Sequence, residues 1–204
     1  MLEKAEATRE KILETAEGLI FEKGFSGTSL RDIVGGANLT KGAFFHHFDD
    51  KAALVRAVVE RWANIDQELF EGFAERAAAL ADNPLQEVLL FLKLFEEWAD
   101  DQDEQLPGCM FASYVYERQQ LDPKTRAFIS EGLNEWIALF EEKFDKLLAT
   151  RCPKIATVTA RELAELAAAL VEGGFILSRV FGDQRHLMGQ LQQLRNYLNL
   201  LFED

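Results

Sequence analysis

Hydrophobic residues recur along most of the chain at intervals of three and four, which is the spacing of one face of an α-helix. The sequence shows neither the strict alternation typical of a β-strand nor a repeat or low-complexity stretch. It is therefore predicted to be all-α, with about nine helices. We expect them over residues 8–25, 29–36, 40–47, 50–81, 83–103, 109–120, 122–150, 159–182 and 183–204.

Cap residues mark several of these helix starts. Asn83-Pro84 and Asp122-Pro123 each pair a capping side chain with a proline, whose fixed φ suits the first helical position. Thr159 with Glu162 three residues later is a capping box. Between two such helices, residues 151–158 are predicted to be a linker.

The stretch from residue 28 to residue 51 is the most informative part of the chain. Ser29 and Asp32 form a capping box, and Asn38 tolerates the left-handed conformation that a tight reversal requires. Thr40 then caps the next helix. Two short helices joined by such a turn predict a helix-turn-helix, whose second helix lies in the DNA major groove.

The composition of that second helix favours DNA over ordinary packing. Lys41-Gly42-Ala43 has no bulk to hold the helix away from the groove floor. Lys51 stands in the first turn of the helix that Asp50 caps, where an ammonium and a backbone N–H can share one phosphate. His46 and His47 are adjacent on the helix and so are poor joint metal ligands, and we expect neither a metal nor a cofactor.

From about residue 8 to residue 59 the sequence resembles the N-terminal DNA-binding domain of the TetR family of one-component transcriptional regulators. The resemblance rests on E-K-G-F at 22–25, T-S-L-R-D-I at 28–33 and T-K-G-A-F-F-H-H-F-D-D-K-A-A-L at 40–54. The family usually has Ala, Gly and Tyr where Gly36, Asn38 and Phe45 stand. Phe45 thus lacks a hydroxyl that in relatives often donates to a phosphate.

The resemblance implies a role for each of eleven residues. Phosphates would be held by Thr28, Ser29 and Lys51. Base edges would be contacted by Arg31, Lys41, Gly42 and Ala43, and Thr40, which caps the second helix, is counted with them. The DNA backbone or the groove wall would be contacted by Phe45, His46 and His47. The resemblance also implies a homodimer on a palindromic operator, most commonly a repressor, that a small-molecule effector releases.

Charge distribution bears on this prediction. The chain has a net charge of −13, which is unusual for a protein that binds a polyanion. Residues 1–51 hold 7 basic and 9 acidic side chains, a net charge of −2, so the remaining 15 basic and 26 acidic side chains give −11 elsewhere. We therefore expect a DNA-binding domain over 1–51 and an acidic, helical effector-binding and dimerisation domain over 52–204.

The last two predicted helices carry apolar seams at alternating spacings of four and three, which favours a four-helix bundle formed by two copies. The seam residues are Leu163, Ala167, Leu170, Gly174, Leu177 and Phe181, followed by Leu187, Leu191, Leu194, Leu198 and Leu201. The alternative is that both seams pack only within their own domain.

The central helices are rich in aromatic residues, most of them ordinary core, yet the family binds effectors in this region. The candidates are Trp98, Cys109, Tyr114, Tyr116, Trp136 and Phe175. Little basic charge lies among them, which favours an uncharged, apolar or cationic effector. Cys109 opens a helix, whose dipole favours a thiolate, and its P-G-C-M-F segment resembles relatives that sense electrophiles or oxidants. Its alternative role is packing.

Other classes of protein fit less well. No apolar run approaches 18 residues, and the first residues lack the apolar core of a signal peptide. Two distant cysteines make no disulfide framework, so we expect a cytoplasmic protein. The sequence has no phosphate-cradling loop, H-E-x-x-H or C-x-x-C, which argues against an enzyme. A helical ligand-binding or adaptor protein with little DNA binding is the alternative, favoured by acidity, Gly35-Gly36 and Phe45.

Overall fold

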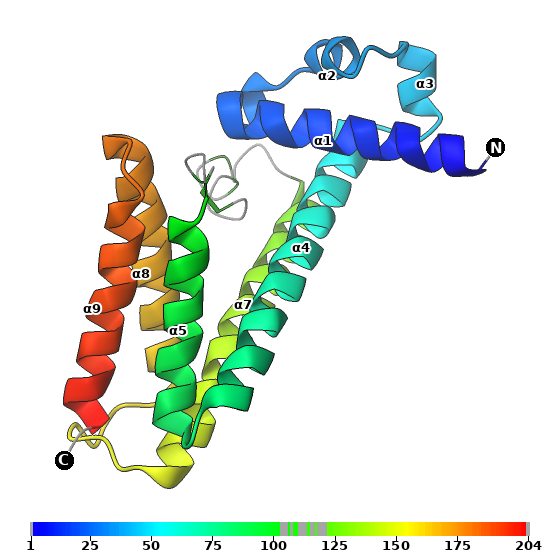
Figure 1. Ribbon diagram of the computed structural model, residues 1–204. Coiled ribbons are helices and arrows are strands. Elements are labelled where there is room, and N and C mark those ends of the chain that lie inside the picture. The colour runs from blue at the N-terminus through cyan, green and yellow to red at the C-terminus, as the bar shows by residue number, and fades with distance from the viewer. Residues whose placement is uncertain are drawn as a thin grey trace. The chain divides into compact units, whose positions relative to one another are not determined.

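The computed structural model describes residues 2–102 and 122–202, together with residues 106, 108, 109, 114 and 117. Over these residues it contains helices and no strand, so the predicted all-α class is confirmed. The helix predicted over 109–120 lies largely outside them. Figure 1 labels α1 (Leu2–Gly27), α2 (Leu30–Gly36), α3 (Lys41–Phe45), α4 (Lys51–Leu80), α5 (Pro84–Asp100), α7 (Pro123–Thr150), α8 (Ala160–Phe181) and α9 (Arg185–Phe202).

The chain forms two compact units, and their limits differ from the boundary expected at residue 51. The first unit comprises residues 1–65 and 110–132, and the second comprises residues 66–109 and 133–204. The difference arises because α4 and α7 are long continuous helices, each of which contributes one part to each unit. The first half of α4 buries Leu54, Val55 and Val58 and so belongs with the N-terminal helices.

In the first unit, α1 supplies a buried stripe with helical spacing, formed by Ile12, Leu13, Ala16 and Ile20. Arg61 of α4 binds two carboxylates of α1, with Nε 2.7 Å from Glu10 and Nη1 2.5 Å from Glu17. Burial raises the pKa of Glu17, and the charge of Arg61 opposes that rise. These contacts fix α1 to the start of α4.

The second unit has a core of α5, α8 and α9 with the adjoining parts of α4 and α7 (Figure 1). Gly174 of α8 lies so close to α9 that a Cβ there would stand 2.9 Å from the Cα of Leu187. Since real Cβ contacts are longer, only glycine permits this approach. The two helices therefore pack tightly within a single chain.

This packing corrects the predicted dimer seam. The α9 leucines at 187, 191, 194, 198 and 201 are between 0% and 3% exposed, in the core of their own unit. On α8, Leu163, Ala167 and Gly174 are buried there as well. A second copy of the chain cannot reach these side chains, so the alternative holds for them: they pack within their own domain. Of the predicted α8 seam, Leu170, Leu177 and Phe181 keep exposed surface.

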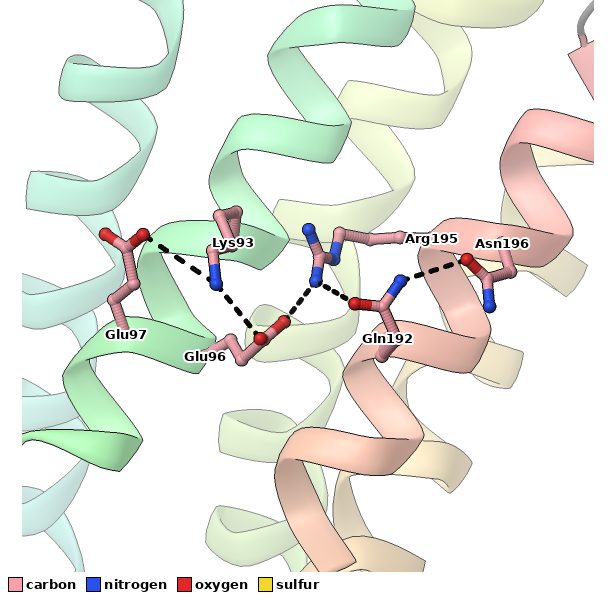
Figure 2. A network of polar contacts seen from close by, with 6 residues as sticks. All are labelled: Lys93, Glu96, Glu97, Gln192, Arg195 and Asn196. Carbon is pink, nitrogen blue, oxygen red and sulfur yellow. Dashed lines mark hydrogen bonds and ion pairs between the residues drawn. The ribbon is translucent and has the colours of Figure 1, made fainter. Parts of the chain in front are cut away.

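A polar network joins α5 to α9 at the edge of this core. Figure 2 shows the Glu96 carboxylate between Lys93, whose Nζ is 3.0 Å away, and Arg195 of α9. Arg195 also donates to Gln192 at 2.7 Å. The side chains of Glu96 and Arg195 are each only 16% exposed, so water screens this pair weakly.

We predict that Arg195→Met destabilises the protein by about 1–3 kcal/mol, because it leaves the poorly exposed Glu96 carboxylate with a single weaker partner. Urea unfolding measures this change. The matched control is Arg185→Met, which removes an ion pair whose arginine is 83% exposed and which should change stability little. If Arg195→Met destabilised the protein no more than Arg185→Met does, the network would contribute little to stability.

Candidate nucleic-acid interface

The helix-turn-helix is built by local hydrogen bonds. Ser29 Oγ accepts from the backbone N–H of Asp32 at 3.2 Å, and the Asp32 carboxylate accepts from the Ser29 N–H at 3.0 Å. Hydrogen bonds from Ser29, its side chain first, hold the pKa of Asp32 below its usual value. The reciprocal bonds confirm the predicted capping box at the start of α2.

The turn between α2 and α3 also follows the sequence. Asn38 has a φ of 53°, the only positive φ among the described residues other than glycine. Thr40 caps α3 by accepting from the N–H of Ala43 at 3.1 Å. At Gly36, a Cβ would stand 2.8 Å from Thr15 Cγ2 of α1, so the glycine lets α2 pack closely on α1.

Buried and exposed aromatic side chains are neighbours in and just after α3. Phe44 and Phe48 are 0% and 5% exposed and fix the helix from behind, whereas Phe45 is 51% exposed. Most of the predicted DNA contacts share the exposed surface, with Ala43 and His47 half-buried at its edge. The exposed members are Ser29, Arg31, Thr40, Lys41, Gly42, Phe45 and His46.

Thr28 does not belong to this surface, and its predicted phosphate contact is wrong for this structure. It is 0% exposed, and its Oγ1 donates to the carbonyl of Gly24 at 2.8 Å. Gly24 itself interrupts α1, with a φ of 75° and a ψ of 169°. Thr28 therefore closes the end of α1, a position that its place in the sequence motif does not reveal.

Lys51 is half-buried and already bonded within the first unit. Its Nζ donates to the carbonyl of Phe25 at 2.7 Å and lies 4.4 Å from the centre of the Phe25 ring. Burial lowers the pKa of Lys51, and the negative charge of Glu117 opposes that effect. The predicted phosphate ligand therefore already has a hydrogen-bond partner within the first unit.

Glu117 is a residue that the sequence argument missed. Its carboxylate accepts from the N–H of Phe25 at 2.9 Å, from the N–H of Ser26 at 2.6 Å and from Ser26 Oγ at 2.5 Å. No spacing rule connects residues that lie about 90 positions apart. Only the fold brings this carboxylate to the end of α1.

The structure separates the predicted effector residues. In the second unit, Trp98 packs beside Phe73 and Phe95, and Trp136 packs beside Phe70 with ring centres 5.8 Å apart. Phe175 packs against the same core. Tyr114 belongs instead to the first unit, where it is 1% exposed with its ring centre 5.7 Å from that of Phe25. Tyr116 lies outside the described residues.

Cys109 of the second unit is half-buried and hydrogen-bonded to the carboxylate of Glu172 on α8. Burial raises the pKa of Glu172, and the bond to Cys109 opposes that rise. The helix that was expected to begin at Cys109 lies mostly outside the described residues. The structure therefore puts the carboxyl group of Glu172 beside the sulfur as a hydrogen-bond partner of the thiol.

We predict that Glu172→Gln accelerates alkylation of Cys109 by iodoacetamide several-fold at neutral pH, because an amide is a weaker hydrogen-bond partner for the thiol than a carboxylate and holds its proton less firmly. Mass spectrometry of the alkylated peptides measures both cysteines in one sample. Exposed Cys152 is the internal control, and its rate should not change. A Cys109 rate that stays equal in the two proteins would mean that Glu172 does not govern its reactivity.

A capped helix-turn-helix with an exposed, basic and aromatic second helix is characteristic of DNA-binding regulators. Comparison with known proteins identifies the family. Residues 12–58 match the model of the bacterial regulatory proteins of the tetR family, and residues 84–192 match the C-terminal domain of LmrA/YxaF-like transcriptional regulators. The second match spans more than half of the chain, so the chain belongs to the TetR family of transcriptional regulators.

Individual relatives agree with this assignment. The chain is 30% identical to the regulator LmrA of Bacillus subtilis over 175 residues, which cover 84% of this chain and 86% of LmrA. It is 29% identical to the repressor BepR of Brucella suis over 190 residues, covering 89% and 85% of the two chains. The family consists of regulators and not of enzymes.

Solved structures show the same fold. A TetR regulator from Chloroflexus aurantiacus matches with a TM-score of 0.82 and 24% identity, covering 98% of both chains. The reduced form of Escherichia coli NemR matches with a TM-score of 0.77 and 22% identity, covering 93% of this chain and 96% of NemR. In the part of the chain that the structure describes, no helix is long and apolar enough to cross a membrane.

Proposed function

We propose that the protein is a cytoplasmic, dimeric repressor that binds a palindromic operator and is released by a small molecule bound in its second unit. The exposed face of α2 and α3 is the observation that carries this proposal. The relatives BepR and NemR are named as repressors, which supports this direction of control.

Arg31 and Lys41 are the residues proposed to read bases. Both are exposed, and neither donates a side-chain hydrogen bond to another described residue, so both are available to a groove. Arginine can pair bidentately with guanine, and the small residues Gly42 and Ala43 let α3 approach closely. Ser29, at the exposed N-cap of α2, is proposed to hold a phosphate.

We predict that Lys41→Ala and Arg31→Ala each weaken binding to an operator found by unbiased selection, by roughly 1–3 kcal/mol where a base contact is lost. Titrations with the operator and its single-base variants measure the affinity and show which position loses discrimination. Lys154→Ala, which removes an exposed lysine of the second unit, is the control. Unchanged affinity in both variants would place the DNA contacts elsewhere.

The dimer interface is proposed to be the outward face of α8. Apolar side chains recur there at helical spacing and remain exposed in the single chain. They include Leu166 (36%), Ile176 (44%), Leu177 (37%), Val180 (69%) and Phe181 (64%). A continuous apolar stripe of this kind indicates a protein contact, and a two-fold axis lets the same stripe serve both copies.

We predict that Val180→Glu dissociates the dimer and abolishes operator binding without unfolding the chain, because the side chain is largely exposed in one copy and would be buried between two. Analytical ultracentrifugation at micromolar concentration measures the first effect. Leu80→Glu changes a 62% exposed leucine of α4 and should leave the dimer intact. A wild-type protein that sediments as a monomer would exclude this interface.

The effector is proposed to bind among the aromatic side chains of the second unit, near Trp98 and Trp136. Aromatic rings and scarce basic charge suit an apolar or cationic molecule better than an anion. A ligand-binding protein with little DNA affinity is the second candidate, and the net charge of −13 favours it. Failure of unbiased selection to enrich any DNA site would support that candidate.

A further inference from the structure

Both the backbone and the ring of Phe25, just beyond the break in α1, contact other residues of the first unit. Its backbone N–H donates to Glu117 at 2.9 Å, and its carbonyl accepts from Lys51 at 2.7 Å. The centre of its ring lies 5.7 Å from that of Tyr114 and 4.4 Å from the ammonium of Lys51. All these residues belong to the first unit. One residue therefore joins α1, the start of α4 and the 114–117 segment.

Backbone N–H groups of α1 fix the position of the Glu117 carboxylate. Its oxygens accept from two consecutive N–H groups, those of Phe25 and Ser26, and from the Ser26 hydroxyl. Gly24 faces the same carboxylate so closely that any added Cβ would collide with it, and its φ of 75° already disfavours other residues. The break in α1 therefore forms a cradle for one anionic group.

Lys51 is the cation beside this cradle. The negative charge of Glu117 acts on the Lys51 ammonium, and the ammonium is bonded to the same residue that Glu117 holds. A carboxylate next to an ammonium reduces the positive potential that a DNA phosphate would meet. Residues 1–51 have a net charge of only −2, so the gain or loss of one cation changes the net charge of this region by a large fraction.

We propose that Glu117 is an intramolecular competitor of the DNA backbone: its carboxylate occupies the two N–H groups beside Lys51, and a phosphate bound there by Lys51 would displace it from the α1 cradle. This inference rests on the proposed function, in which Lys51 contacts DNA. Glu117 is then a positioning residue that acts on DNA through Lys51.

Salt-dependent binding to a non-specific 20-base-pair duplex tests the proposal, because each neutralised phosphate steepens the slope of log K against log salt by about 0.9. Glu117→Gln is expected to bind more tightly than wild type and to have a slope steeper by about that amount. The gain in affinity should shrink about threefold between 50 and 200 mM salt. In a protein that carries Lys51→Met, adding Glu117→Gln should change neither the affinity nor the salt slope.

Glu22→Gln is the matched control, since it removes one negative charge from the exposed surface of α1 near its end. A purely long-range effect of charge would make the two glutamine variants behave alike, which would overturn the proposal. So would a Glu117→Gln protein whose salt slope equals that of wild type. If wild type binds neither the selected operator nor the duplex, the proposed function itself fails, which is a different result.

Hydrogen exchange in the wild-type protein provides a second test that needs no variant. Adding DNA should accelerate exchange of the Phe25 and Ser26 amides, because both lose the Glu117 carboxylate when it leaves the cradle. Slower or unchanged exchange at both amides in the DNA complex would show that Glu117 stays in place, and would refute the competition.

Discussion

The break in α1 at Gly24 is the constraint on which the DNA-binding unit depends, because several elements are fixed to the residues around it. Thr28 bonds back to the Gly24 carbonyl and so sets where α2 begins. Lys51 bonds the Phe25 carbonyl and sets the start of α4. Glu117 occupies the two adjacent N–H groups. A change at this point therefore reaches the cap of α2 and the first turn of α4 together.

The net negative charge of the chain limits its non-specific attraction to DNA. A regulator must bind one operator and leave the rest of the genome, and weak non-specific attraction favours that selectivity. The exposed face of α2 and α3 carries few cations, chiefly Arg31 and Lys41, and the nearby Lys51 is partly neutralised by Glu117. In the proposed dimer, affinity then comes from base contacts and from the pairing of two copies.

Packing inside the second unit decides which surface remains for that pairing. Gly174 lets α8 and α9 approach closely at Leu187, and the α9 leucines at 187, 191, 194, 198 and 201 are buried in the core of one chain. The outward side of α8 then keeps Leu177, Val180 and Phe181 exposed. The apolar surface proposed for dimerisation is thus the side of α8 that intrachain packing leaves uncovered.

The sequence by itself determined the helical fold, the capped starts of α2, α3, α5 and α8, and most of the exposed face of α2 and α3. These features depend on hydrogen bonds between residues three or four apart and on helical periodicity, both of which a sequence displays directly. Only the tertiary structure decided that Thr28 is buried, that Lys51 is bonded to Phe25, that Glu117 reaches α1 and that the α9 seam faces its own core. Each of these depends on which chain segments meet in space or on which of two apolar faces another helix covers, and local spacing carries no information about either.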